Sequence, residues 1–338
     1  MRKSTWILGG LAVLLLAAAA VTRLAVYPAV HRVPSDLDVT LQYTGKATLL
    51  DALALESGDL ANAVKRDVPV TVDRHVRVVD TSGDTAVFAD RQTLHGPDHE
   101  TLADIKHRWA LDRRDLDARP APEGSGAEPH RGLVIGWPLD PGKRDYRWWD
   151  FATSTEVDAV YDGTETVADR TAYRYRIRAE GPLTDPDLSA ALPPALPKEA
   201  VSGIAATMPA GQRPDTAALA GLPDTVPLTY AATTDLRVWG DSETGSVLDT
   251  AQRRVFTART TEEAGGGTLF PVSDVDVRVT DDSVRDRADY ADSAARSLWL
   301  VGTLLPLALL VAAALIAALA IWRARRAGRR SEDAPGTA

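Results

Sequence analysis

Two apolar runs, one near each end of the chain, constrain its fold more than any other feature. Residues 6–22 and residues 298–322 contain no charged side chain. A helix needs about 20 apolar residues to cross the roughly 30 Å hydrocarbon core of a bilayer. The second run exceeds that length, and Trp299 and Trp322 stand near its ends, where aromatic rings favour the headgroup region. The sequence therefore predicts a transmembrane helix over 298–322.

The N-terminal run is shorter and has two interpretations. It follows two basic residues and contains three alanines at 18–20, a pattern that also fits a cleaved signal peptide. The apolar character continues past Arg23 to Tyr27, and an arginine at that depth can extend its charge to the interface. We therefore predict an uncleaved transmembrane helix, a signal anchor, over 6–27.

Basic residues flank both runs on the sides of the two chain termini. Arg2 and Lys3 precede the first run, and a cluster of arginines in 323–338 follows the second. The positive-inside rule therefore places residues 1–5 and the basic tail in the cytoplasm. The chain is expected to cross the plasma membrane twice, with residues 28–297 as an extracytoplasmic domain.

Composition limits the partners and chemistry of that domain. The chain carries a net charge of −9, and the acidic residues lie mainly between the two apolar runs. This balance argues against a nucleic-acid partner. The chain has no cysteine, which excludes disulfides, thiol nucleophiles and thiolate metal ligands.

Alternating apolar and polar residues predict strands over 39–43, 173–179 and 274–279, because a period of two turns one face to a core and the other to water. Turn-forming residues separate such segments at 43–46, 82–84, 162–163 and 243–245. The predicted fold class is a mainly β (α+β) extracytoplasmic domain, an antiparallel sheet or barrel with a helical insertion, flanked by two transmembrane helices.

The helical insertion is the apolar, proline-rich segment 183–226. Proline is excluded from central strands and helix interiors, so this stretch is expected to form short helices and loops. It either packs on the sheet as an insertion or forms a mobile apolar cap over a hydrophobic pocket. The candidate residues for binding an apolar ligand are Leu188, Leu192, Leu196, Ile204, Met208 and Leu219.

Residues 281–297 lack glycine and proline and begin with Asp281, Asp282 and Ser283, which are good helix-capping residues. They run directly into the second apolar segment. We predict a helical stalk over 281–297.

Catalytic motifs are not found in the sequence: there is no G-x-S-x-G, H-E-x-x-H, Walker loop or dinucleotide fingerprint. His95 and His99 have a spacing that binds metal on a helix. Gly96 and Pro97 between them favour a solvated turn over a metal site. We therefore expect no enzyme activity, no cofactor and no metal, and nominate no catalytic residue.

The stretch 132–150 concentrates aromatic side chains, which suit either a core anchor or an aromatic-lined surface for an acyl chain or glycan. Its string Gly136-Trp137-Pro138, followed by Lys143, Tyr146, Trp149 and Asp150, resembles a family of actinobacterial membrane proteins, the porin PorA family, formerly a domain of unknown function. Further matching stretches lie at 38–51, 90–93, 161–165, 173–175 and 238–247, and the two terminal helices match as well.

The resemblance covers nearly the whole chain and implies a channel across an outer mycolate membrane. It brings no catalytic or binding residues. We interpret the motif positions Trp137, Pro138, Tyr146, Trp149 and Asp150 as structural. A transmembrane barrel needs an apolar lipid-facing band, whereas the outward positions Arg174, Arg176 and Arg178 are charged. A weaker likeness, in architecture alone, is to CD36-type scavenger receptors, which have two terminal helices and a lipid tunnel.

Three functions follow as hypotheses. The leading one is a non-enzymatic cell-envelope protein whose outer domain binds or conveys an apolar or lipid ligand. The others are a porin-like channel component and a structural scaffold that recognises partner proteins. The expected partners are the membrane bilayer and an apolar or lipid ligand, and the sequence leaves oligomerisation open.

Overall fold

The computed structural model describes residues 2–264 and 266–332, and the chain divides into two compact units. One unit is Pro34–Ala291, called the β domain below. The other combines the chain up to Val33 with the chain from Asp292 onward.

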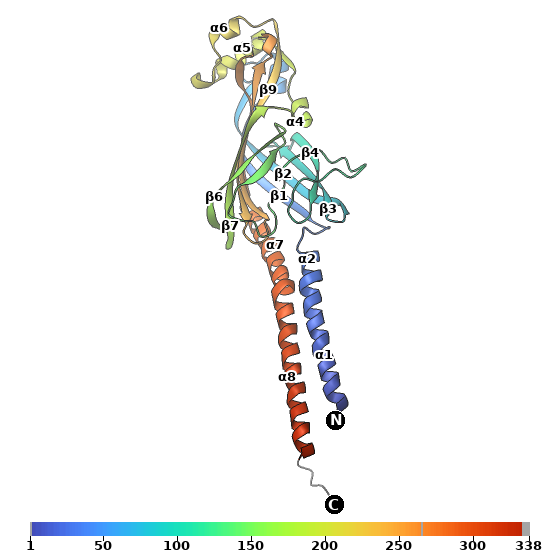
Figure 1. The fold of residues 1–338 in the computed structure, drawn as a ribbon. Coiled ribbons are helices and arrows are strands. Elements are labelled where there is room, and N and C mark those ends of the chain that lie inside the picture. Colours follow the sequence, from blue (N-terminus) through green and yellow to red (C-terminus); the bar gives the residue numbers. More distant parts are fainter. Residues whose placement is uncertain (1, 265, 333–338) are drawn as a thin grey trace, which may run out of the picture. The chain divides into compact units, whose positions relative to one another are not determined.

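Long helices form both ends of the chain (Figure 1). The N-terminal segment consists of α1 (Arg2–Val21), a π-helical turn (Thr22–Val26) and α2 (Tyr27–Val30). The C-terminal segment consists of α7 (Asp281–Trp299), a π-helical turn (Leu300–Leu304) and α8 (Leu305–Glu332).

Both segments are, in length and composition, able to cross a membrane. The apolar spans are Trp6–Val30, with a mean hydropathy of 2.2, and part of Asp281–Arg326, with a mean hydropathy of 2.8. Helices α1 and α8 lie side by side (Figure 1). A Cβ atom at Gly302 would stand 2.4 Å from the Tyr27 ring. The glycine therefore lets the second π-helical turn approach the Tyr27 ring at the start of α2 closely.

The β domain is built on one antiparallel sheet, as its fold class predicted. Ten strands lie in the order β4-β3-β2-β1-β11-β10-β9-β7-β6-β5, and the sheet curls into a half-barrel (Figure 1). Their bounds are β1 Asp38–Leu50, β2 Val64–Ser82, β3 Thr85–His95, β4 Thr101–Asp112, β5 Tyr146–Asp150, β6 Thr155–Val167, β7 Arg170–Pro182, β9 Thr225–Asp241, β10 Val247–Thr260 and β11 Thr268–Val279. The three-residue strand β8 (Ala195–Pro197) pairs with β9 alone.

The alternation predicted for 173–179 is confirmed and shows how the faces of the sheet differ. Tyr175 and Ile177 are fully buried on the inner face. Arg176 and Arg178 point outward, where they pair with Asp162 and Asp235 at 2.8 and 3.1 Å. One face therefore carries the core, and the other carries exposed ion pairs.

Two of the predicted turns are confirmed and two are wrong. Gly83 and Gly245, both with positive φ, turn the chain between β2 and β3 and between β9 and β10. Residues 43–46 instead lie inside β1, where a Cβ atom at Gly45 would be 2.0 Å from the carbonyl oxygen of Asp276. Residues 162–163 form a bulge inside β6. Glycine in a strand thus marks a bulge or a close backbone approach here.

The segment 183–226 contains the short helices that were predicted and one strand that was not. Its helices are α4 (Pro186–Ala190), α5 (Lys198–Thr207), a 3-10 turn (Ala210–Gln212) and α6 (Thr216–Ala220). Strand β8 ties it to β9, whose own start includes Pro227. Pro227 is tolerated there because it lies among the first residues of β9, in the short part of the strand that pairs with β8.

Two more helical pieces pack on the sheet within the β domain. Helix α3 (Ala52–Ser57) begins where the Asp51 carboxylate accepts the N–H groups of Leu53 and Ala54. The first turns of α7 bury Ala288 and Ala291, and the Ser283 hydroxyl accepts the N–H of Gln42 at 3.0 Å. The predicted stalk is therefore helical, and its first half is packed against β1 and β10.

Candidate functional site

The inner face of the half-barrel encloses an apolar cavity of about 640 Å³. It lies within the β domain, between strands β1 to β4, β10 and β11 and the segments around α3 and α4. A cavity of roughly 150 Å³ admits benzene, and drug-sized ligands occupy roughly 300–1,000 Å³. The cavity is thus large enough for a substantial apolar ligand.

Sheet side chains form the floor and most of the walls of the cavity. Val72, Leu94 and Ile105 face it from β2, β3 and β4, and Phe256 and Val275 face it from β10 and β11. Aliphatic side chains dominate because every second residue of these strands points to the inner face. Removing this surface from water drives folding, and it also favours an apolar occupant.

The proline-rich segment supplies the opposite wall. Helix α4 starts at Pro186, and the buried Asp185 carboxylate caps it by accepting the N–H of Leu188 at 2.8 Å. Farther along, the N–H of Leu228 donates to the carbonyl of Pro194 at 2.9 Å, and the Tyr230 hydroxyl donates to Pro193. These contacts fix the chain between α4 and β8 in place.

The six leucine, isoleucine and methionine candidates divide into two groups. Leu188, Leu192 and Leu196 line the cavity. Ile204 and Met208 are buried in the hydrophobic cluster under α5, and Leu219 packs against the same cluster. All six residues belong to or pack against one hydrophobic cluster, and three of them also line the cavity.

Sequence reasoning missed the main polar group of the cavity, Arg254 on β10. Its side chain is only 8% exposed, and its Nε–H has no hydrogen-bond partner. Within residues 2–264 and 266–332, no carboxylate lies at ion-pair distance from its guanidinium, whose Cζ lies 4.4 Å from the centroid of the Phe151 ring. Burial lowers the pKa of Arg254. The buried hydroxyl of its cross-strand neighbour Thr234 also lacks a partner in the described chain.

A second, largely buried arginine on the same face is paired with a carboxylate. Arg74 on β2 donates two hydrogen bonds to Asp90, at 3.0 and 2.6 Å. Burial alone would lower the pKa of Arg74, but the Asp90 carboxylate raises it. The inner face thus holds one neutralised arginine and one whose charge has no direct counterion.

His107 joins the α4 wall to a neighbouring loop. Its Nδ1 lies 3.0 Å from the Glu128 carboxylate and its Nε2 lies 3.5 Å from Asp185. The ring stacks on Trp109 with centroids 5.0 Å apart. Burial alone would lower the pKa of His107, but Glu128 raises it; burial raises the pKa of Asp185. The imidazole therefore lies between two carboxylates, one of which, Asp185, caps α4.

The aromatic motif residues form a packed cluster at another part of the inner face. Trp137 is 2% exposed, and its ring stacks on Tyr175 and Trp148 at 4.4 and 5.6 Å. Tyr146 meets Tyr175 edge-on at 5.8 Å. With rings packed on rings, this region resembles a core anchor.

Two further motif positions, Trp149 and Asp150, make backbone and turn contacts. The Trp149 N–H donates to the carbonyl of Leu133 at 2.9 Å. Asp150 is buried and accepts both the N–H and the hydroxyl of Thr153, at 3.0 and 2.7 Å. Both sets of contacts hold β5 in place.

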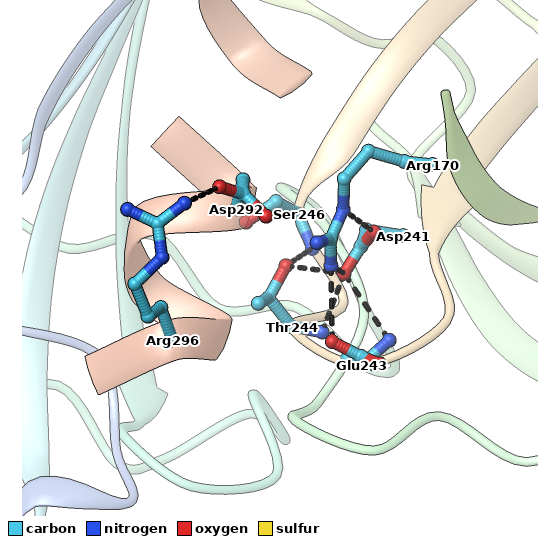
Figure 2. A network of polar contacts seen from close by, with 7 residues as sticks. All are labelled: Arg170, Asp241, Glu243, Thr244, Ser246, Asp292 and Arg296. Atoms are coloured by element: carbon cyan, nitrogen blue, oxygen red, sulfur yellow. Dashed lines mark hydrogen bonds and ion pairs between the residues drawn. The ribbon is translucent and has the colours of Figure 1, made fainter. Parts of the chain in front are cut away.

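The motif also meets the β9–β10 turn shown in Figure 2. Asp241 is fully buried and accepts the N–H and hydroxyl of Thr244, while Arg170 donates to both of its oxygens at 2.7 and 2.9 Å. The N–H of Trp137 donates to the carbonyl of Gly245 at 3.1 Å, and a Cβ at Gly245 would stand 2.2 Å from the Pro138 carbonyl. Two separate motif stretches therefore form one structural contact.

The histidine pair does not gather metal ligands. His95 ends β3, and its Nε2 lies 3.4 Å from the Asp73 carboxylate. Gly96 to Glu100 forms the turn to β4, as expected. Among the described residues, no group of three or more His, Asp or Glu side chains is arranged to hold a metal ion.

Comparisons with known proteins identify one family. The sequence profile of the family "Porin PorA" matches residues 5–322, nearly the whole chain. No curated protein matches the chain.

Among solved structures, a MaoC domain dehydratase from Chloroflexus aurantiacus is 12% identical, covers 80% of each chain and has a TM-score of 0.14. A conserved hypothetical protein of Mycobacterium tuberculosis with a double hotdog fold is 11% identical, covers 80% of each chain and has a TM-score of 0.15. Scores this low relate neither fold to the half-barrel.

Proposed function

The chain belongs to the porin PorA family, and from that premise we propose that it is a non-enzymatic cell-envelope protein whose β domain binds an apolar or lipid ligand. The observation that carries the proposal is the cavity of about 640 Å³ on the inner face of the sheet. Its walls come from six strands and from the apolar segment around α4. A large, mainly apolar cavity with few polar groups is the usual form of a small-molecule site.

The proposal includes anchoring by both terminal helices, with the two termini in the cytoplasm and the β domain outside the plasma membrane. The two apolar helices and the basic residues at both chain ends support it. Because the chain has no cysteine, single cysteines can report the topology. Glu123→Cys, on an exposed loop, should react with an impermeant maleimide in intact cells, and Arg325→Cys only after permeabilisation. The reverse pattern would overturn the orientation.

Ligand binding is tested by analysing what purifies with the protein. The full-length chain is extracted in mild detergent, and its bound lipids are identified by mass spectrometry. Leu192→Trp places a bulky ring at the cavity wall and should reduce the lipid retained. Leu53→Trp is the matched control, because Leu53 is 76% exposed and does not line the cavity. Equal lipid retention by the two variants and the parent would contradict the proposal.

A second candidate, a channel component, rests on the family description. The outer face of the sheet bears charged pairs such as Arg176 with Asp162 and Arg253 with Asp274. Such a face suits water better than hydrocarbon. A channel would therefore require several copies to assemble through their terminal helices. Discrete conductance steps from the purified protein in planar bilayers would favour the channel, and their absence across its oligomers would remove it.

A further inference from the structure

We infer that the cavity takes an amphiphile with a carboxylate head, whose chain lies among the leucines of the wall and whose carboxylate binds Arg254. This inference rests on the proposed function and names the chemical class of its ligand. It follows from three observations: the burial of Arg254, the lack of a counterion for it, and the position of the other polar groups that line the cavity.

Arg254 lies at the boundary between the cavity and the core. It is among the lining residues, as are Gln252 on the same strand, Gln92 on β3 and Ser273 on β11, while the exposed Glu56 on α3 is the one carboxylate among the lining residues. Residues 252 and 254 share one face of β10 because side chains alternate along a strand. The opposite wall, from Leu188 to Leu196, is aliphatic. The cavity therefore has a polar side and an apolar side, which is the form that an amphiphile fits.

The guanidinium of Arg254 lacks the partner that buried arginines require. An isolated buried charge is strongly disfavoured unless it is paired and hydrogen-bonded. Arg74 satisfies this rule through Asp90, whereas the Nε–H of Arg254 is buried without an acceptor. Arginine stays protonated in proteins and matches a carboxylate through two parallel N–H···O bonds. An anionic ligand would supply the missing acceptor.

The carboxylates around Arg254 explain why we expect a single negative charge. Asp150 already accepts two hydrogen bonds from Thr153, and Asp185 caps α4 and faces His107. Together with Asp90, they form an acidic surround that acts on Arg254 over a longer distance. A doubly charged phosphate monoester would meet more repulsion from these groups than a carboxylate does.

The experiment compares four hexadecyl ligands on the full-length, delipidated protein in phosphatidylcholine nanodiscs. The ligands are palmitate, hexadecyl phosphate, hexadecanol and a hexadecyl trimethylammonium salt, with empty nanodiscs subtracted. Palmitate should bind about tenfold or more tightly than hexadecanol, since a charged hydrogen bond is worth at least about one decade in affinity. Hexadecyl phosphate should bind more weakly than palmitate, and the cation should bind weakest.

Variants assign the effect to Arg254. Arg254→Met keeps an unbranched apolar stem, removes the guanidinium and should weaken palmitate binding by about tenfold to a hundredfold while leaving hexadecanol binding unchanged. Arg254→Lys should restore part of the palmitate affinity. Arg253→Gln is the matched control, because Arg253 pairs with Asp274 on the outer face. Without ligand, Arg254→Met should unfold at the same temperature as the parent or higher, whereas a structural arginine would lower it.

The outcomes separate the two proposals. Equal binding of palmitate and hexadecanol, or unchanged palmitate binding by Arg254→Met, would overturn the role of Arg254 and leave apolar binding standing. Tighter binding of hexadecyl phosphate than of palmitate would overturn the choice of a carboxylate. If the parent protein binds none of the four ligands, the proposed apolar-binding function itself fails.

Discussion

The inner face of the half-barrel has two regions that differ in how they are filled. Around Trp137, which is 2% exposed, rings stack on Tyr175 and Trp148 in a packed cluster. Around Phe256, aliphatic side chains from the same sheet and a wall from outside it enclose about 640 Å³. The comparison teaches that the sheet alone does not decide where a cavity forms. A cavity remains where the segment that covers the concave face of the sheet crosses it without filling the space with side chains.

The two inner-face arginines repeat this contrast in electrostatic terms. Arg74 is neutralised by Asp90, so its burial serves the fold. Arg254 borders the cavity and has no counterion among the described residues. A buried polar group without a partner is tolerated where a ligand supplies that partner, since unsatisfied polar groups concentrate at functional sites.

The filled region should depend most on its central ring. Trp137→Ala removes the ring that stacks on both Tyr175 and Trp148, and we expect a loss of about 3–5 kcal/mol in the free energy of unfolding. Leu192→Ala at the cavity wall should cost less, because a side chain that faces a void has fewer neighbours to lose. Urea unfolding of the purified protein measures both. Equal losses would mean that the two regions are packed alike.

The paired and unpaired arginines should respond differently to the loss of charge. Asp90→Asn leaves Arg74 without its carboxylate, and we expect a loss of about 3 kcal/mol from a broken buried pair. Arg254→Met should cause no loss, because it removes a charge that has no ion pair. Urea unfolding of the two variants without ligand measures the contrast. A comparable destabilisation by both would show that Arg254 is neutralised within the fold.

A larger side chain should lower the stability of the filled region, whereas at the cavity it should leave stability unchanged or raise it. Ala172 is fully buried outside the cavity, and Ala172→Leu should cost about 1–3 kcal/mol through overpacking. Ala103 lines the cavity, and Ala103→Leu should be neutral or stabilise by about 0.5–1 kcal/mol through filling it. Thermal unfolding of the two variants tests this. Destabilisation by Ala103→Leu as large as that by Ala172→Leu would argue that the cavity closes in solution.

The smallest effect concerns pH and the α4 wall. Glu128 raises the pKa of His107 in the folded protein, so their interaction stabilises the fold fully below the unfolded pKa of about 6.5 and is lost as pH rises through the folded pKa. The parent should exceed Glu128→Gln in stability by less than about 1 kcal/mol near pH 6, because Glu128 is partly exposed. The difference should shrink as the pH increases. Urea unfolding of the parent and Glu128→Gln at pH 6 to 9 measures this difference. A difference in stability that grows with pH would contradict the prediction.

The strands were readable from sequence where alternation was clean, and less readable where glycine intervened. The alternation at 173–179 predicted both faces correctly because Tyr175, Ile177 and Ala179 are buried there. Gly45 and Gly163 were read as turns, since a local pattern does not distinguish a turn from a bulge or a close backbone approach. That distinction depends on pairing with another strand: Gly45 lies against β11, far away in the chain, and Gly163 pairs with Arg174 of the adjacent strand β7.

The cavity was harder to predict than the fold. Leu196 and Ile204 belong to the same hydrophobic cluster, yet of the two it is Leu196 that also lines the cavity. The pairing of β8 with β9 separates them, and this long-range contact leaves no local signal. Arg254 escaped notice because Gln252, Arg254 and Phe256 share a face without the apolar alternation that marks an interior strand.

The place of β11 has a consequence for how the β domain is assembled during synthesis. This strand is the last of the sheet to be made, and yet it lies in the middle, between β1 and β10. Until it emerges, β1 and β10 each expose an unpaired edge, and such edges invite pairing with other chains. The two halves of the sheet therefore wait for residues 268–279 to join them, so folding is expected to be slow and to finish late. A chain cut short before Thr268 would retain both halves of the sheet and lack the strand that makes them one.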